Sequence, residues 1–449
     1  MPIALILADD LTGAADAGVQ FASHGWRTLL VLDPSGMGGA DVLSISTDSR
    51  TLPSAADAGQ AVSRILSTLH AQPAYHDLLP SSGCEALPGF RLVYKKMDST
   101  LRGYPAAELA ALLATLGETR ALIAPAFPSQ GRTTRGGVQY LNGQPLDRSS
   151  FTSEIATSNL LDLFGSGQPA AARPDALTPA LLPLQVVRQG QVAAGNALRQ
   201  ARGLLIADAE TDSDLQTLAR ATLAEGLRVC CGSAGLAAAL VECLAAPAAT
   251  PLLCFSPTPG PILAVAGSLN PATLAQLDYA ARQGVTIVRP SSDFYQDTGE
   301  TGISETVARV ASGLAAGEPV VLAAPIQPAT LPDPVDFLSP EEGEHRKKED
   351  AVSPDRVQIS FVTRLAWVIS AALENRMPGG LFLTGGDTAR AVCAVMGCTR
   401  IWLGGQIEPG IPWGILADGR FPGLPVVTKA GGFGVDRTLF NAIQFLQGK

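Results

Sequence analysis

Two adjacent carboxylates and a hydroxyl follow the first apolar run of the sequence. Residues 3–16 read IALILADDLTGAAD, so Asp9 and Asp10 come directly after the run and Thr12 lies two positions further on. The run predicts a buried strand, and the small residues that follow predict a helix. In an open α/β sheet, such a turn lies at the carboxyl edge of the strands, where ligands bind. One aspartate is enough to cap the helix, so capping does not explain the second.

Two more polar turns follow later strand patterns, in the motifs TDSR and KKMDSTLRG. Their candidate binding residues are Asp48, Ser49, Arg50, Lys96, Asp98, Ser99 and Arg102. Strand ends in a parallel sheet meet at one edge, so we expect these residues to share a pocket with the first turn. Arginine matches a carboxylate with two parallel hydrogen bonds, and the acids suit hydroxyl groups. The pocket therefore fits a small hydroxylated anion. The alternative is a set of ordinary polar connections between strand and helix.

A longer polar segment at 125–146 follows the fifth strand pattern, and we expect it to form a wall of the same pocket. The residues that it offers are Gln130, Gly131, Arg132 and Arg135.

Three glycine-rich turns in the second half predict a site for nucleotide phosphates. They lie in VAGSLNP, LTGGDTA and VTKAGGFG, and each follows an apolar strand pattern. Their candidate ligands are Ser268, Gly385, Gly386, Asp387, Thr388, Gly431 and Gly432, with Asn270 as a helix cap and Lys429 beside the last turn. Backbone N–H groups in such turns and at helix starts bind phosphate. The sequence has neither a P-loop nor the dinucleotide-binding fingerprint.

The elements that position these residues alternate between strand and helix. In the first half we expect strands at 3–8, 28–32, 41–46, 91–96 and 120–127 and helices at 13–24, 54–70 and 105–117. The second half continues with strands at 262–267, 285–290, 319–325 and 380–385 and helices at 271–283, 303–315, 359–375 and 387–396. This alternation predicts an α/β fold of two domains, with mostly parallel, doubly wound sheets facing an inter-domain cleft.

Proline-rich stretches set the predicted domain boundaries. We place a substrate-binding domain at 1–245, a Pro-rich linker at 246–261 and a nucleotide-binding domain at 262–449, because proline favours extended linkers. A second stretch at 327–358 holds several prolines and the charge run EEGEHRKKED, which is typical of a solvated surface loop.

Composition excludes several classes of protein. The net charge of −9 argues against a nucleic-acid surface, which requires a basic face. The sequence shows no signal-peptide pattern and no run near the ~20 apolar residues that cross a bilayer. We therefore expect a cytoplasmic protein without a membrane partner. The seven cysteines and four histidines follow no metal-ligand spacing, so we expect reduced thiols and no metal site made by side chains.

The motifs taken together resemble the four-carbon acid sugar kinase family. They are ADDLTGAADAG, TDSR, KKMDSTLRG, APAFPSQGRTTRGGVQYLNGQPL, VAGS, TGGDTA and IEPGIPWG…PVVTKAGGFG, in order from residue 3 to about residue 434. The resemblance implies that the N-terminal domain binds the sugar acid, that the C-terminal domain binds ATP, and that the γ-phosphoryl group passes to the 4-hydroxyl. TDSR and DSTLRG look like the threonate and erythronate kinases. Oxo-tetronate kinases look different, with a Cys after the arginine matching Arg50 and a Lys at the position of Arg102.

For such a reaction, we expect each candidate residue to have a role that follows from its chemistry. Arg50 and Arg102 bind the substrate carboxylate, and Asp9 and Asp98 bind hydroxyls, with Thr12, Asp48, Ser49 and Ser99 in the same site. Asp10 orients or deprotonates the 4-hydroxyl, and Lys96 screens charge near the transferred phosphoryl group. ATP and Mg²⁺ are the expected cofactors, and Mg²⁺ neutralises the phosphates.

D-threonate is the expected substrate, with D-erythronate and a 3-oxo-tetronate as alternatives. Two other classes remain: a two-lobed sugar-acid binding protein without catalysis, and a nicotinamide-dependent oxidoreductase, which the missing fingerprint disfavours. The expected partners are a sugar acid and ATP, and a homo-oligomer is left open.

Overall fold

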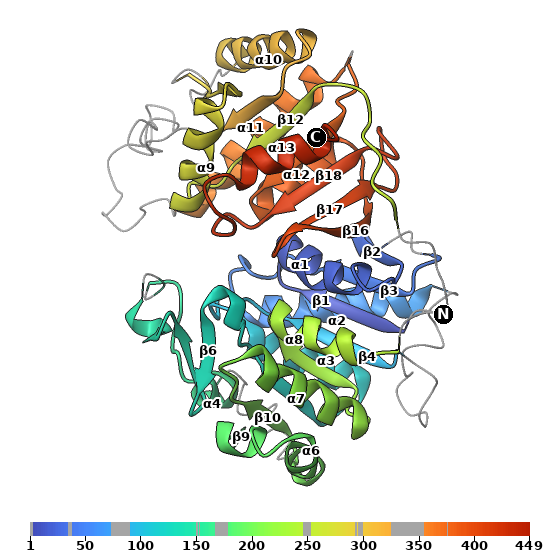
Figure 1. The fold of residues 1–449 in the computed structure, drawn as a ribbon, viewed down its shortest axis with the longest axis vertical. Helices are drawn as coiled ribbons and strands as arrows, with labels where there is room; N and C mark the ends of the chain where they lie inside the picture. Colours follow the sequence, from blue (N-terminus) through green and yellow to red (C-terminus); the bar gives the residue numbers. More distant parts are fainter. Residues whose placement is uncertain are drawn as a thin grey trace, which may run out of the picture. The chain divides into compact units, whose positions relative to one another are not determined.

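The structure is a computed structural model. It describes residues 3–34, 38–72, 90–149, 151, 153–166, 178–245, 253–291, 294, 300–324, 354–374 and 376–449. The chain divides into two compact units (Figure 1). The first comprises Met1–Leu253 and Trp402–Gly405, and the second comprises Cys254–Ile401 and Gln406–Lys449.

The first unit is built on a parallel sheet of eight strands. The strands are β1 (Ala4–Ala8), β2 (Thr28–Val31), β3 (Val42–Ser46), β4 (Leu92–Lys96), β5 (Ala121–Ala124), β9 (Pro179–Leu182), β10 (Leu204–Ala207) and β11 (Val229–Gly232). Their order is β2-β3-β1-β4-β11-β5-β10-β9. Ala8 at the end of β1 is in register with Ser46 on one side and Lys96 on the other. The three polar turns that follow these strands are therefore neighbours.

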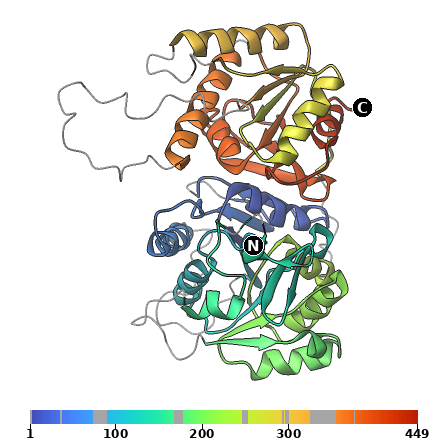
Figure 2. The ribbon, with the colours of Figure 1, turned by 90° about the vertical axis from the view of Figure 1, so that its left-hand side faces the viewer.

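Helices cover both faces of this sheet, as Figure 2 shows. On one face, α1 (Leu11–Ala22), α6 (Gln191–Gln200), α7 (Asp212–Ala224) and α8 (Ala234–Cys243) pack in a row. A separate pair consists of α2 (Ala55–Ala71) and α3 (Pro105–Leu116), and two short helices, α4 (Leu160–Ser166) and α5 (Leu184–Val187), complete the unit. Helix α1 is buried along its whole length, and most of its side chains are small. It can therefore lie close to the sheet and bring its first turn to the strand ends.

The segment at 125–146 forms structure that its sequence pattern did not indicate. It contains a separate antiparallel sheet of β6 (Arg132–Arg135), β7 (Val138–Leu141) and β8 (Gln144–Pro145). Short 3₁₀ turns at Pro128–Gln130 and Leu146–Arg148 flank this sheet. A bridge from Thr134 to Ala209 joins it to the segment after β10.

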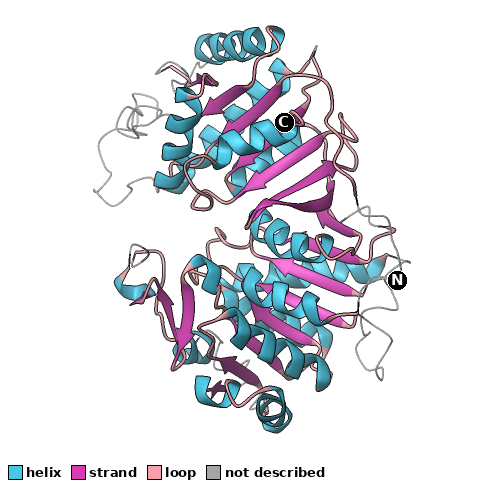
Figure 3. Cartoon of the chain, viewed as in Figure 1, coloured by secondary structure: helices cyan, strands magenta, loops and turns pink. Residues whose placement is uncertain are grey.

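The second unit repeats the α/β scheme (Figure 3). Its strands are β12 (Ile262–Ala266), β13 (Thr286–Val288), β14 (Val320–Ala323), β15 (Gly380–Thr384), β17 (Ile411–Leu416) and β18 (Pro425–Lys429). A further strand, β16 (Arg400–Glu408), has its ends in this unit and its middle, Trp402–Gly405, in the first. The order β13-β14-β12-β15-β18 is parallel, and β17 joins β18 in the antiparallel sense. Helices α9 (Pro271–Arg282) and α13 (Thr438–Leu446) pack together, as do α10 (Glu300–Ala315), α11 (Pro354–Ala372) and α12 (Gly386–Val395).

The predicted α/β class, with mostly parallel sheets, is confirmed. The strand expected at 285–290 is shorter, Thr286–Val288, and the helix expected at 359–375 begins earlier, at Pro354. Residues 246–252 of the expected linker and 325–353, which hold most of the expected surface loop, lie outside the described residues. No helix in the described part of the chain has the length and apolar character needed to cross a membrane.

Candidate active site

The turn after β1 uses its two aspartates differently. Asp10 is the N-cap of α1, and its carboxylate accepts hydrogen bonds from the Gly13 N–H and the Thr12 hydroxyl, both at 2.7 Å. Asp9 is 2% exposed and takes no part in the cap. Helix capping therefore explains Asp10. It does not explain Asp9, the other carboxylate of this turn.

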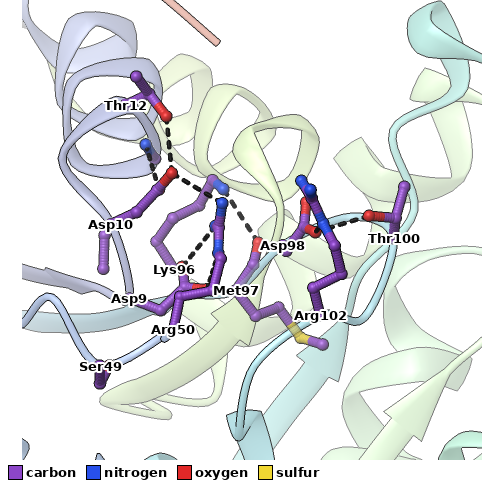
Figure 4. Close-up of polar contacts among 12 residues, drawn as sticks. Asp9, Asp10, Thr12, Ser49, Arg50, Lys96, Met97, Asp98, Thr100 and Arg102 are labelled. Atoms are coloured by element: carbon purple, nitrogen blue, oxygen red, sulfur yellow. Dashed lines mark hydrogen bonds and ion pairs between the residues drawn. The ribbon is translucent and has the colours of Figure 1, made fainter. Parts of the chain in front are cut away.

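Arg50 binds both of these aspartates, as Figure 4 shows. Its Nε and Nη2 donate to Asp9 at 2.7 and 3.0 Å, and its Nη1 donates to Asp10 at 2.7 Å. Burial alone would raise the pKa of Asp9, but the charges of Arg50, Lys95 and Lys96 outweigh it and hold that pKa below its ordinary value. Asp9 is therefore an ionised, fixed acceptor.

The KKMDSTLRG turn forms a second carboxylate–guanidinium pair beside the first (Figure 4). Asp98 accepts a hydrogen bond from the Thr100 hydroxyl at 2.6 Å and another from Arg102 Nε. Burial would raise the pKa of Asp98, yet the charges of Arg102 and Arg50 lower it well below its ordinary value. The Arg102 side chain is 34% exposed, lies over the Phe151 ring and approaches Glu154 at 3.4 Å. One guanidinium of the site therefore stays accessible.

Lys96 is buried at the start of α1. Its ammonium donates to the Met97 carbonyl at 2.9 Å and would lie only 3.3 Å from a Cβ placed on Gly13. The same Cβ would be 2.6 Å from the Asp10 carboxylate. Glycine is therefore required here so that the lysine and the capping aspartate can both approach the helix.

Beneath these side chains lies a buried ion pair that the sequence did not single out. Lys95 Nζ is 2.8 Å from Glu108 Oε2, and the two side chains are 0% and 1% exposed. Glu108 also accepts from the Ser49 hydroxyl, which is fully buried. Ser49 therefore anchors its turn from below, whereas its place in the TDSR motif predicts a residue that binds substrate.

The remaining residues expected in this pocket have varied surroundings. Asp48 has a positive φ of 48° and accepts from the Ser46 hydroxyl at 2.7 Å. Ser99 is buried, and its carbonyl accepts from the Gln139 amide at 3.0 Å. Arg135 is 67% exposed and pairs with Glu210.

Two charged groups complete the cluster. Arg132 lies close enough to Asp98, Arg102 and Asp16 for their charges to affect its pKa, which burial lowers. Asp16, one helical turn after Thr12, is 6% exposed, and its Oδ1 has no hydrogen-bond partner among the residues that the structure describes. Burial raises the pKa of Asp16 to about 6. Only its spacing from Thr12 along α1 could have indicated it.

The second unit brings its three glycine turns together at the ends of the adjacent strands β12, β15 and β18. A Cβ on Gly431 would lie 2.2 Å from Ser268 Oγ, and one on Gly267 would lie 2.0 Å from Thr388 Oγ1. Gly385 has a φ of 100°, and its α carbon faces Thr388 and Ser268. These contacts leave no room for side chains, so the backbone itself lines the cradle.

Helix starts add to this cradle. Asn270 caps α9 by accepting from the Ala272 N–H at 3.0 Å, and α12 begins at Gly386 with Asp387 in its first turn. The predicted ligands Ser268, Gly385, Gly386, Asp387, Thr388, Gly431 and Gly432 thus come from neighbouring loops of one unit. Among the described residues, no group of three or more His, Cys, Asp or Glu side chains is arranged to hold a metal ion.

Comparisons with known proteins match both units. A family model described as a sugar-binding N-terminal domain matches residues 4–240, and one described as a nucleotide-binding C-terminal domain matches residues 263–439. The D-threonate kinase of Salmonella typhimurium is 32% identical over 99% of this chain and 98% of its own length. The 3-oxo-tetronate kinase of Methylobacterium radiotolerans is 29% identical over 95% of each. A crystal structure of a Salmonella typhimurium protein, 20% identical over 98% of each chain, has the same fold with a TM-score of 0.74.

Proposed function

Because this chain belongs to the four-carbon acid sugar kinase family, we propose that it transfers the γ-phosphoryl group of ATP to the 4-hydroxyl of D-threonate. The observation that carries this proposal is the paired arrangement of Asp9–Arg50 and Asp98–Arg102 at neighbouring strand ends. Fixed carboxylates suit the hydroxyl groups of a sugar acid, and an accessible arginine suits its carboxylate. The similarity to a D-threonate kinase over almost the whole chain supports the choice of substrate.

We assign the substrate carboxylate to Arg102 first, because its guanidinium is the more exposed of the two. Arg50 adds positive charge to the same region while it holds Asp9 and Asp10 in place. Asp9 and Asp98 accept hydrogen bonds from the substrate hydroxyls, together with Thr12, Asp48 and Ser99. Ser49 acts through the position of its turn.

Asp10 orients the 4-hydroxyl and accepts its proton, and Lys96 balances negative charge near the phosphoryl group. Phosphoryl transfer depends mainly on positioning and electrostatic stabilisation, which is the kind of help these fixed charges supply. This scheme does not need a strongly basic side chain at the 4-hydroxyl, because the transition state of phosphoryl transfer is largely dissociative.

ATP is placed at this cradle because its three glycines pack so closely against Ser268 and Thr388 that backbone and hydroxyl groups come together at one point. The phosphates would meet backbone N–H groups and the hydroxyls of Ser268 and Thr388. Mg²⁺ would be held mainly by the phosphates, with Asp387 as the nearby carboxylate, and would neutralise their charge. The proposed reaction has two further requirements. The 4-hydroxyl must be aligned with the γ-phosphate, and water must be excluded.

A substrate panel tests this proposal. The purified protein is incubated with ATP, Mg²⁺ and, in turn, D-threonate, D-erythronate and a 3-oxo-tetronate. ADP release and a new phosphomonoester signal in ³¹P NMR are measured for each acid. Turnover that is fastest with D-threonate supports the proposal, whereas preference for another acid reassigns the substrate within the family. Binding of the acids without any turnover would overturn the proposed reaction.

A further inference from the structure

Lys429, the last residue of β18, is buried, and its ammonium group binds backbone carbonyls of this chain. It is 1% exposed, and its ammonium is bound by the turn that follows it. Nζ donates to the carbonyls of Ala430 and Gly431, both at 2.9 Å, and of Phe433 at 3.2 Å. The Thr273 hydroxyl of α9 lies 3.3 Å away. Lys429 therefore gathers carbonyl oxygens of the 430–433 turn around one cation.

This arrangement fixes which way the peptide groups of the 430–433 turn point. In a planar trans peptide the C=O and the following N–H point in opposite directions. Since the Ala430 and Gly431 carbonyls face Lys429, the N–H groups of Gly431 and Gly432 face away from it. Helix α9 reinforces this orientation, because Thr273 donates to the Gly431 carbonyl at 2.8 Å and Gln276 donates to the Phe433 carbonyl at 3.0 Å.

The α carbons of the same two glycines lie against the loop after β12. A Cβ on Gly431 would be 2.2 Å from Ser268 Oγ, and one on Gly432 would be 3.3 Å from Asn270 Nδ2. The N–H groups of Gly431 and Gly432, which point away from Lys429, thus belong to a turn that packs beside the Ser268 hydroxyl that we assign to phosphate binding. Adjacent N–H groups of this kind form a concave anion site.

We propose that Lys429 is a positioning residue for ATP, which holds the carbonyls of the 430–433 turn so that the N–H groups of Gly431 and Gly432 bind the phosphates. This inference rests on the proposed function, because it assumes that the second unit binds ATP. Lys429 acts through the backbone and does not touch the phosphates.

The charge state of Lys429 offers a way to observe this role. Burial lowers the pKa of Lys429 to about 7. Among the described residues, the ammonium group binds the carbonyls of the turn and the Thr273 hydroxyl of α9. On the neighbouring strand β15, Thr384 is in register with Lys429. Raising the pH through neutrality removes the cation that gathers the carbonyls. The turn then binds phosphate less well.

The test compares Lys429→Met with the wild type. Losing hydrogen bonds to a charged donor raises the KM for ATP roughly 10- to 100-fold, while the KM for the sugar acid stays unchanged. In the wild type this KM also rises from about pH 6 to about pH 8.5, whereas in Lys429→Met it follows only the titration of ATP itself. Thr273→Val, which removes a neutral donor to the same turn, is the matched control and gives a smaller, pH-independent increase.

A KM for ATP in Lys429→Met equal to that of the wild type would overturn the inference. So would a variant that keeps the pH dependence of the wild type. If Lys429→Met does not fold, as judged by circular dichroism and thermal unfolding, Lys429→Gln is measured with the same expectations. A wild-type protein that binds no ATP in calorimetry overturns the proposed function instead.

Discussion

Arg50 and Asp9 form a two-pronged ion pair, in which Nε and Nη2 of the arginine donate to the two oxygens of the carboxylate at 2.7 and 3.0 Å. The third donor, Nη1, reaches Asp10, so one guanidinium sets the distance between the two acids. An ammonium cannot reproduce this planar fork. We therefore expect Arg50→Lys to lower kcat/KM for the sugar acid roughly 10- to 100-fold, with ATP binding retained.

Steady-state kinetics with each substrate varied in turn measures this effect. Arg135→Lys is the matched control, because Arg135 belongs to the same unit but is exposed. Kinetics of Arg50→Lys that match this control would mean that the ion pair does not position the acids for catalysis.

Arg102 offers a test of substrate choice. Its Nε is bound to Asp98 and its Nη1 makes a longer contact with the exposed Glu154, but the side chain is 34% exposed and can meet a substrate carboxylate. We expect Arg102→Lys to raise the KM for D-threonate about tenfold, since a lysine makes a less directed contact. The KM for a 3-oxo-tetronate should change less, because the family resemblance implies that oxo-tetronate kinases have a lysine at this position. The ratio of kcat/KM for the two acids is the measurement, and equal losses on both would contradict the assignment.

The Lys95–Glu108 pair predicts a large effect on stability. Removing one partner of a buried ion pair leaves an uncompensated charge, which costs about 3–5 kcal/mol. Lys95→Met should therefore lower the free energy of unfolding of the first unit by this amount, as measured by urea denaturation. The double variant Lys95→Met/Glu108→Leu should recover most of the loss, because neither charge remains. A double variant no more stable than the single one would rule out the unpaired charge as the cause.

Asp16 predicts a pH dependence of stability. Burial raises its pKa to about 6, above the ordinary value of 3.8, so the unfolded chain loses this proton first as the pH rises. Asp16 therefore makes the protein less stable as the pH rises from about 4 to about 6, by about 2 to 3 kcal/mol in total, with little further change above that. Asp16→Asn should remove this dependence and be more stable than the wild type at pH 7.5.

Urea denaturation at about pH 5 and pH 7.5 gives the comparison for Asp16. The control is Glu305→Gln, at an exposed position of α10. If Asp16→Asn and the wild type lose the same stability between these pH values, the buried carboxylate is not the group that titrates.

The sequence was sufficient to place the polar turns at neighbouring strand ends. Apolar runs gave the strands, and parallel pairing brought Asp9, Arg50 and Asp98 to one edge. The direction of each side chain was harder to predict. Lys95 and Lys96 are consecutive on β4, so they point to opposite faces, one toward Glu108 and the other toward Gly13. Lys95 pairs with Glu108 of the following helix, and Lys96 donates to the adjacent Met97 carbonyl, so no local pattern reveals the direction of either side chain.

The small sheet of β6, β7 and β8 was missed for a related reason. Its strands are short, and the first reads RTTR, with no apolar alternation to mark a buried face. Their stability comes from pairing with one another and from the bridge to Ala209, which are contacts that only the folded chain provides.

Trp402–Gly405, near the C-terminal end of the chain, belongs to the first unit, where Leu403 covers Gly18 of α1. A truncated protein that stops before the Pro-rich stretch would lack this segment and leave that part of α1 without its apolar cover. Separate expression of the two halves is therefore a poor way to study them. A circularly permuted or internally shortened gene that keeps Trp402–Gly405 with the N-terminal residues would be the better route to an isolated sugar-acid unit.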